Sequence, residues 1–165
     1  MTAEERRHLQ RIIPGETSPL ELFQERLRGS DHYPWKMCVA CILLNRTQGQ
    51  QVELVLWELF NKWPTPALLA SASSTALEQH LRPLGLWRKR GAVLIQLSHT
   101  WNALEISGAK TETFSRILGL LPGIGAYAQD SWKIFVEGRL YDVFPTDLRL
   151  RAYLLWARTE VSKGN

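Results

Sequence analysis

The chain of 165 residues is poor in cysteine, and its two cysteines, Cys38 and Cys41, are too few to build a disulfide framework. This shortage favours an intracellular setting over a secreted one. The C-x-x-C spacing also occurs in metal and redox sites, but the chain has no second pair that could complete a four-thiolate site. Both cysteines lie in the apolar run WKMCVACILL, and we expect them to pack in the core.

Long apolar runs are missing as well. No stretch reaches the roughly 18 apolar residues that a membrane-spanning helix needs. The N-terminal sequence MTAEERRHLQ is too polar and too charged for a secretory signal. We therefore expect an intracellular protein that does not associate with a membrane.

What the chain does contain is enough apolar material for a folded domain. Hydrophobic residues make up 45% of the 165 residues, which argues against disorder and allows one domain with its own core. We expect a single domain over residues 1–165, in which residues 1–17 form an N-terminal extension. The net charge of +4 permits a polyanionic partner, although many basic proteins bind none.

Apolar residues recur with the helical period along most of the chain. The run PWKMCVACILLNR, which starts at Pro34, is apolar almost all round and predicts a central helix. Further helices are expected at 18–27, 51–62, 65–71, 73–81, 88–101, 111–120, 126–136 and 147–158. Only RLYDVF has a weak strand pattern, so the predicted fold class is all-α.

Residues that cap helix N-termini mark several of the expected starts. In TSPLELFQERL, Ser18 is expected as the N-cap, with Pro19 at the first helical position and Glu21 completing a capping box. TPALLAS and SSTALEQHL each begin with a residue suited to capping, and Thr111 is expected to cap TETFSRILGL. The chain therefore divides into short helices with short connections, as in a compact helical domain.

The stretch LGLLPGIGAYAQDSWKIF, residues 118–135, breaks the helical pattern with three glycines and a proline. Pro122 cannot continue the preceding helix, while Gly123 and Gly125 permit positive φ and leave the backbone uncovered. The next helix is expected to begin at Gly125 or Ala126, where its free N–H groups would suit a phosphate. The alternative is a tight helix-to-helix turn without a ligand. A P-loop is excluded, because the lysine and Ser/Thr required after the glycines are missing.

Together with the residues that follow it, this hairpin resembles a known superfamily. LLPGIGAYAQDSWKIF followed by DVFPTDLRL is similar to the helix-hairpin-helix, Gly/Pro-rich, aspartate (HhH-GPD) superfamily of DNA glycosylases, with the helix-hairpin-helix at 113–136. PWKMCVACILLNRTQG, LWELFNKWP and LRPLGLWRKR are similar, in the same order, to the glycosylase domain of the methyl-CpG-binding-domain type of thymine DNA glycosylase. The resemblance covers approximately residues 20–160. We expect no methyl-CpG-binding domain in this chain.

The resemblance implies a catalytic aspartate after the hairpin, and Asp147 in FPTD matches it. A carboxylate close to C1′ of deoxyribose stabilises the positive charge that the sugar gains as the base departs, and can orient or deprotonate a water. Taken alone, Asp147 is equally suited to cap the helix that begins in PTDLRL.

A second catalytic position lies two residues past Gly125. Bifunctional relatives carry there a lysine that forms a Schiff base with the sugar, whereas this chain has Tyr127, which cannot form an imine. The resemblance therefore implies a monofunctional enzyme with Tyr127 beside the flipped nucleotide. The alternative role of Tyr127 is that of a half-buried helix residue.

A target base must leave the duplex to reach Asp147, and the resemblance implies residues that fill the gap. Arg46 in LLNRTQG and the leucines Leu84 and Leu86 in RPLGLW match the intercalating and orphan-base-reading elements. Taken alone, they are equally well a surface charge and two core leucines. Gln24 in LFQERL resembles the glutamine that hydrogen-bonds the pyrimidine edge, and an amide suits the donors and acceptors of thymine or uracil.

Basic residues near these elements are candidates for contacts to the DNA backbone. Arg149 lies where the superfamily has a basic residue near a phosphate. Arg88, Lys89 and Arg90 follow the Pro-Gly turn and are either phosphate contacts or a solvated charged face. Many relatives hold an iron–sulfur cluster on four cysteines after the last helix. This sequence ends at TEVSKGN without them, so we expect no cluster, no other cofactor and no metal.

The sequence thus predicts a DNA glycosylase that starts base excision repair. The expected substrate is double-stranded DNA with thymine or uracil opposite guanine, and the expected reaction is hydrolysis of the N-glycosidic bond. We expect a monomer, located in the nucleus of a eukaryote or in the cytoplasm and nucleoid of a prokaryote. Three alternatives remain: a superfamily member that removes adenine or alkylated purines, a noncatalytic helix-hairpin-helix module that clamps DNA, and a helical protein-interaction domain.

Overall fold

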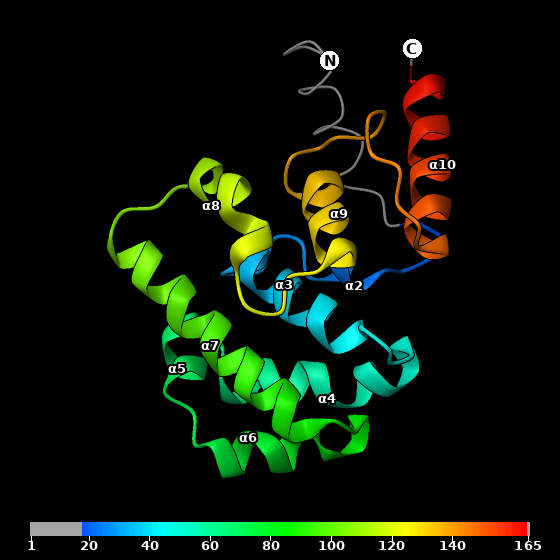
Figure 1. Ribbon diagram of the computed structural model, residues 1–165. Helices are drawn as coiled ribbons and strands as arrows, with labels where there is room; N and C mark the ends of the chain where they lie inside the picture. Colours follow the sequence, from blue (N-terminus) through cyan, green and yellow to red (C-terminus); the bar gives the residue numbers. More distant parts are fainter. Residues whose placement is uncertain (1–17, 165) are drawn as a thin grey trace.

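The computed structural model describes residues 18–164, and these residues form helices and connecting loops without a strand (Figure 1). The elements are α2 (Phe23–Arg26), α3 (Tyr33–Leu44), α4 (Gly49–Lys62), α5 (Pro66–Ala70), α6 (Ser74–Leu81), η1 (Arg82–Leu84), α7 (Trp87–Ile106), α8 (Thr111–Ile117), η2 (Leu118–Leu120), α9 (Ala126–Phe135) and α10 (Leu148–Lys163). The predicted all-α fold class is confirmed, and RLYDVF lies in the irregular segment between α9 and α10. The expected N-terminal extension, residues 1–17, lies outside the described residues.

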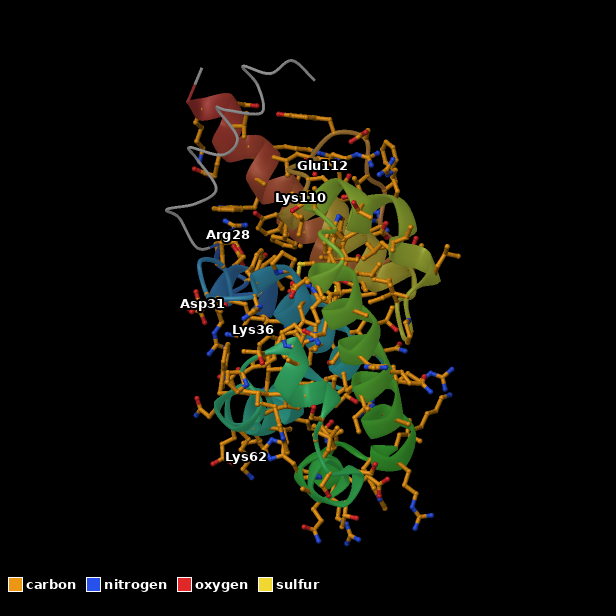
Figure 2. The ribbon with its side chains drawn as sticks, turned by 90° about the vertical axis from the view of Figure 1, so that its left-hand side faces the viewer. Arg28, Asp31, Lys36, Lys62, Lys110 and Glu112 are labelled. Carbon is orange, nitrogen blue, oxygen red and sulfur yellow. The ribbon has the colours of Figure 1, made fainter. Side chains whose placement is uncertain are left out.

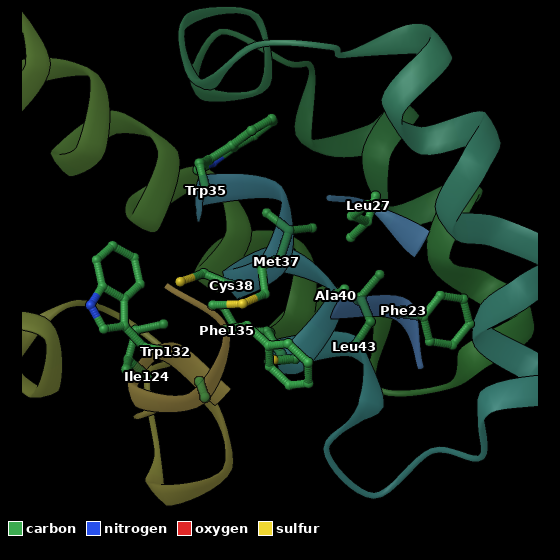
Figure 3. Packing of buried hydrophobic residues seen from close by; sticks show 14 of the residues in the cluster. Phe23, Leu27, Trp35, Met37, Cys38, Ala40, Leu43, Ile124, Trp132 and Phe135 are labelled. Atoms are coloured by element: carbon green, nitrogen blue, oxygen red, sulfur yellow. The ribbon is translucent and has the colours of Figure 1, made fainter. Parts of the chain in front are cut away.

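Helix α3 is the centre of the fold because its side chains are apolar on nearly every side. From Trp35 to Leu43, every residue except Lys36 is buried. Helix α3 packs against α2, α4, α7 and α9, and Figure 3 shows Phe23 of α2 and Trp132 of α9 among the side chains around it. Burying one large apolar side chain contributes about 1.5–3 kcal/mol. The predicted central helix is therefore confirmed, and it holds the rest of the chain in place.

The remaining helices form two groups on either side of α3 (Figure 1). In the first group, the long helix α7 packs against α5 and α6, and α4 packs against α6. Trp35 of α3 donates its indole N–H to Ser98 Oγ of α7 at 3.1 Å, which ties this group to the centre. In the second group, α9 and α10 meet through the rings of Phe135 and Tyr153, whose centroids are 4.6 Å apart.

Two of the expected helix caps are formed. The Leu68 amide donates to Thr65 Oγ1 at 3.1 Å at the start of α5, and the Ala76 amide donates to Ser73 Oγ at 3.3 Å at the start of α6. Each such cap contributes about 1 kcal/mol, because it satisfies an amide that has no partner within the helix. Thr111 was expected as a cap but is the first residue of α8 itself.

The first helix of the described residues, α2, begins later than predicted, and its capping box has a different register. Neither Ser18 nor Glu21 lies in the helix, since α2 starts at Phe23. Glu25, not Glu21, accepts the hydrogen bonds at this end: from the Leu22 amide at 2.9 Å, and from Ser18 N and Oγ at 2.8 and 2.7 Å. These three hydrogen bonds to the buried Glu25 carboxylate outweigh the local sequence pattern that favours an earlier start of the helix.

The glycine-rich stretch forms a turn between α8 and α9. Helix α8 ends at Ile117, the 3-10 turn η2 follows, and the chain reverses direction before α9 begins at Ala126. Gly123 has a φ of 75°, and Ile124 is buried. The turn is thus anchored in the core by an apolar side chain, with glycine at the position that needs left-handed backbone.

Both cysteines are buried, as expected, and neither forms a disulfide. In the part of the chain that the structure describes, no three His, Cys, Asp or Glu side chains are placed to hold a metal ion. Likewise, no helix between residues 18 and 164 is both long enough and apolar enough to cross a membrane.

Candidate active site

A cleft of about 1020 Å³ is formed by four segments that lie far apart in the sequence. They are the segment through α2, the turn between α3 and α4, the hairpin with the first turn of α9, and the beginning of α10. The residues that line it include seven of the expected site residues: Gln24, Arg46, Gly123, Gly125, Tyr127, Asp147 and Arg149. The six charged residues labelled in Figure 2 are not among its lining residues.

Asp147 combines the two roles that its sequence context allows. It is the N-cap of α10, and its Oδ1 accepts a hydrogen bond from the Leu150 amide at 2.9 Å. Its other oxygen, Oδ2, accepts no hydrogen bond from residues 18–164, and the half-buried side chain lines the cleft. The cap therefore fixes the orientation of the carboxylate and leaves one oxygen available to a ligand.

Gln24 and Tyr127 are joined in a buried polar network beside the cleft. The Gln24 amide Nε2 donates to the Tyr127 hydroxyl at 2.9 Å and to Ser131 Oγ at 3.1 Å. The Tyr33 hydroxyl donates to the main-chain oxygen of Gln24 at 2.7 Å and so fixes its backbone. The side-chain oxygen Oε1 of Gln24 is buried and has no hydrogen-bond partner. Leaving such an acceptor unpaired costs about 1–3 kcal/mol, and the cost disappears when a donor reaches it.

Burial keeps the titratable groups of this network protonated. It raises the pKa of the Tyr127 hydroxyl above its ordinary value, and the negative charge of Asp147 acts in the same direction. Burial also raises the pKa of the Cys41 thiol to about 12, although a hydrogen bond with Ser131 opposes it. At neutral pH the phenol and the thiol are therefore neutral, and neither is an activated nucleophile.

The two hairpin glycines are required for different reasons. A Cβ added to Gly123 would lie 2.4 Å from Val93 Cγ1 and 3.0 Å from Ile42 Cδ1, and its φ is positive. A Cβ added to Gly125 would meet nothing within 4 Å, and its φ is −98°. Gly123 is thus needed for packing and backbone conformation, whereas Gly125 leaves the N-terminus of α9 open beside the cleft.

The three candidates for filling the gap in the duplex lie in different surroundings. Arg46 is exposed in the α3–α4 turn, lines the cleft and has a φ of 62°. Leu86, at the start of α7, is 58% exposed and also has a positive φ, 49°. Leu84 is 9% exposed and belongs to the hydrophobic core. Leu84 therefore has its alternative role, that of a core leucine, whereas the side chain of Leu86 lies at the surface.

The expected phosphate-binding residues also separate into groups. Arg149 lines the cleft, and its Nη2 donates to the main-chain oxygen of Leu20 at 2.7 Å. Arg88 and Lys89 are exposed at the start of α7 but do not line the cleft. Arg90 differs from the expectation: it is 6% exposed, and its guanidinium donates to main-chain oxygens within the fold. A buried guanidinium with internal acceptors is not a phosphate contact.

Several known proteins are similar to the chain in amino-acid sequence. No profile of a protein family matches it. A methyl-CpG-binding domain protein 4-like protein of Arabidopsis thaliana is 33% identical over 138 residues, which are 82% of this chain and 28% of that protein. A thymine-DNA glycosylase of Aeropyrum pernix is 35% identical over 94 residues, 57% of this chain and 41% of that protein. A thymine/uracil-DNA glycosylase of Pyrobaculum aerophilum is 33% identical over 95 residues, 58% of this chain and 40% of that protein. The chain thus spans less than half the length of each of these three relatives.

Solved structures of other proteins have a fold similar to that of this chain. A thermostable thymine-DNA glycosylase superposes with a TM-score of 0.60 over 82% of this chain and 61% of that chain, at 16% identity. An endonuclease III trapped in a covalent intermediate with DNA gives 0.59 over 79% of this chain and 65% of that chain, at 19% identity. The chain belongs to the HhH-GPD superfamily of DNA glycosylases. Like its solved superfamily neighbours it is built of helices, and its hairpin and α10 border the cleft described above.

Sequence reasoning does not find two residues that hold parts of the candidate site in place. Ser131 holds the Gln24 amide, but a serine in a helix gives no local signal, and only its spacing of one turn from Tyr127 places it on the same face. Arg90 lies in a run of basic residues, and such a run does not reveal which member points inward. Both residues are recognised only when distant segments are seen in contact.

Proposed function

We propose that the chain is a monofunctional DNA glycosylase that releases thymine or uracil paired with guanine, by hydrolysis of the N-glycosidic bond in double-stranded DNA. One observation carries the proposal: the Asp147 carboxylate, the Gln24 amide and the Tyr127 hydroxyl surround the same cleft. Relatives named thymine-DNA and thymine/uracil-DNA glycosylases support this class of substrate. The cleft of about 1020 Å³ is large enough for an extruded nucleotide.

Asp147 would act on the sugar of the extruded nucleotide. As the bond between C1′ and the base lengthens, the base takes the electron pair and the sugar becomes positively charged, which a facing carboxylate stabilises. Because the Leu150 amide holds Oδ1, the carboxylate is oriented before the substrate arrives. Oδ2 then takes a proton from a water whose oxygen bonds to C1′, and the product is an abasic site with an intact strand.

Gln24 would recognise the base. Its unpaired Oε1 needs a donor, and the N3–H group of thymine or uracil is such a donor. The hydroxyls of Tyr127 and Ser131 can each donate or accept a hydrogen bond. The Gln24 side-chain amide therefore keeps hydrogen-bond partners at these hydroxyls when it reorients toward the base. A site built around a hydrogen-bonding amide discriminates strongly against bases that leave it unpaired.

The surrounding residues would hold the opened duplex. Arg46, which is exposed and lines the cleft, would enter the space that the base leaves, and Leu86 is exposed at the neighbouring turn. The open N-terminus of α9 after Gly125 suits a backbone phosphate, and Arg149 beside the cleft adds a positive charge. Arg88 and Lys89 are exposed and available to more distant phosphates.

The reaction as proposed needs only residues of this chain and water. Tyr127 offers no amine for an imine with the sugar, so no strand cleavage by that route is expected. We expect the protein to work as a monomer without cofactor or metal. A role in DNA repair would place it inside the cell, where the chromosome is.

The first experiment measures base release from a panel of duplexes. Thymine or uracil opposite guanine is offered beside adenine opposite oxidised guanine, an alkylated purine and fully paired duplex, and abasic sites are scored after alkaline cleavage. The wild-type protein is expected to release thymine or uracil opposite guanine. Asp147→Asn is expected to slow release at least about a hundredfold, since it removes the charge that faces the sugar. Asparagine remains a good N-cap, so the melting temperature and DNA affinity should be retained.

Asp142→Asn is the matched control. It makes the same change of charge in the same loop, but Asp142 pairs with Arg139 at 2.8 Å and does not line the cleft. Its rate of base release should equal that of the wild-type protein. Full activity of Asp147→Asn would remove the catalytic assignment, release of adenine or alkylated purine alone would change the substrate, and binding without release of any base would favour a DNA clamp.

A further inference from the structure

Arg90 joins the two turns that carry Arg46 and Leu86. Its Nη1 donates to the main-chain oxygens of Leu84 at 3.0 Å and Gly85 at 3.4 Å, in the turn before α7. Its Nη2 donates to the main-chain oxygen of Asn45 at 2.8 Å and to the Thr47 hydroxyl, in the turn between α3 and α4. The second set of acceptors brackets Arg46, and the first set immediately precedes Leu86. One guanidinium thus spans two turns that are about forty residues apart in the sequence.

Arg46 and Leu86 both have a backbone conformation that needs support. Arg46 and Leu86 have φ angles of 62° and 49°, in the left-handed region that non-glycine residues rarely adopt. Such conformations persist where the surroundings fix them, and they gather at functional sites. The bonds from Arg90 fix the main chain next to each of them. Both side chains remain exposed, so the conformations are not required by packing of the side chains themselves.

The chemistry of the bridge is also unusual for a purely structural contact. Arg90 is 6% exposed, and all four acceptors are neutral oxygens, with no carboxylate among them. Burying a cation without a counter-ion is costly, and an apolar residue would often serve stability equally well. A planar guanidinium is suited to hold several acceptors in a fixed mutual arrangement, as the four oxygens around Arg90 are held.

We propose that Arg90 is a positioning residue that holds Arg46 and Leu86 in register, so that both enter the duplex together when the target base swings out. The inference rests on the proposed function, in which these two side chains fill the opened duplex. Arg90 itself touches neither DNA nor the base. Its effect is expected on base extrusion and on everything that follows extrusion, and not on general affinity for undamaged DNA.

The test compares Arg90→Met with Arg158→Met. Methionine keeps the apolar length of the side chain but removes the four hydrogen bonds. Arg158 also donates to a main-chain oxygen, that of Leu140 at 2.6 Å, but this acceptor lies in the loop before α10 and in neither of the turns that carry Arg46 and Leu86. Extrusion is followed by the fluorescence of 2-aminopurine placed beside a thymine opposite guanine. We expect Arg90→Met to reduce the fluorescence rise and to slow base release at least about tenfold, while matched duplex binds as before and Arg158→Met behaves like the wild type.

A double-mutant cycle measures the register directly. In the protein with Arg90, Arg46→Ala and Leu86→Ala should not act independently on the base-release rate. The fold-loss of rate in the double variant should differ by about threefold or more from the product of the two single fold-losses. In the Arg90→Met background the same two losses should multiply. Unchanged coupling in that background, or a fluorescence rise equal to that of the wild type, would overturn the inference.

Further variants keep the result interpretable if Arg90→Met folds poorly. Arg90→Lys retains the charge but cannot reach all four acceptors, and Thr47→Val removes only one of them, so both should fold and show intermediate losses of extrusion. Folded Arg90→Lys and Thr47→Val proteins with wild-type extrusion would overturn the inference while leaving the proposed function intact. Absence of any fluorescence rise and base release in the wild-type protein would instead overturn the proposed function, and the inference with it.

Discussion

A single side chain, Tyr127, is the basis of the proposed monofunctional reaction. Its hydroxyl accepts a hydrogen bond from the Gln24 amide at 2.9 Å, and burial raises its pKa so that it stays neutral. A neutral phenol can contact an extruded nucleotide but cannot form an imine with C1′. A lysine at the same position would offer an amine, and the resemblance of the hairpin implies that bifunctional relatives use one there.

The residue-scale prediction is therefore the absence of a covalent intermediate. When the wild-type protein is incubated with an abasic duplex and borohydride, no protein–DNA adduct should accumulate, because Tyr127 cannot form the imine that borohydride reduces. Denaturing gel electrophoresis of labelled DNA is the measurement. Tyr127→Lys, which places an amine at this position, is the matched variant and should gain an adduct. Strong trapping by the wild-type protein would contradict the monofunctional assignment.

At the scale of elements, the hairpin between α8 and α9 has a packed side and an open side. A Cβ at Gly123 would overlap the side chains of Val93 and Ile42, whereas a Cβ at Gly125, just before α9, would meet no atom. The sequence alone presents the two glycines as equivalent. In the structure, Gly123 is needed for packing and backbone conformation, whereas the space beside Gly125 is open to a ligand.

This difference predicts opposite outcomes for two similar substitutions. Gly123→Ala should lower the free energy of unfolding by about 2 kcal/mol or more, because it combines a steric overlap with a left-handed backbone. Gly125→Ala should change stability by less than about 0.5 kcal/mol. It should weaken binding to a duplex with an abasic site about tenfold, since the methyl group would obstruct a phosphate at the α9 amides. Urea denaturation and fluorescence anisotropy measure the two effects.

The opposite pattern would identify the hairpin as a structural turn only. If Gly125→Ala binds the duplex as tightly as the wild-type protein, the open amides of α9 do not contact the DNA backbone. If Gly123→Ala is as stable as the wild-type protein, the contact with Val93 is not a constraint on the fold.

The elements were predictable from the sequence to the extent that local patterns decide them. The all-round apolar run of α3, the caps Thr65 and Ser73, and the hairpin all follow from neighbours in the chain. The start of α2 was not predictable, because it depends on hydrogen bonds from Ser18 to the Glu25 carboxylate, seven positions further along the chain. Most expected site residues line the cleft, but the partners that orient them, such as Ser131 and Arg90, come from distant segments and leave no local pattern.

At the scale of the whole molecule, the chain buries several weak acids around α3 and the cleft. Burial raises the pKa of the Cys41 thiol from an ordinary 9.0 to about 12, and it raises the pKa of Cys38 as well. Burial likewise raises the pKa of Tyr33, Tyr127 and Tyr153 above the ordinary value of 10.0. In the unfolded chain these groups would ionise at their ordinary values. Folding therefore holds protons that the unfolded chain releases at alkaline pH.

The sign of the pH dependence follows from these raised pKa values. Below about pH 9 the groups are protonated in both states and stability is unaffected; as pH rises through 9 and then 10, the unfolded chain loses protons and the folded chain becomes less stable. Each group that ionises only on unfolding contributes a loss of about 1.4 kcal/mol per pH unit.

Urea denaturation at a series of alkaline pH values should show this decline in the free energy of unfolding. Tyr153→Phe removes one fully buried group and should make the decline shallower, whereas Tyr141→Phe removes a tyrosine that is 52% exposed and should not. Equal slopes for the two variants would mean that the buried hydroxyl ionises as readily in the folded chain as in the unfolded one.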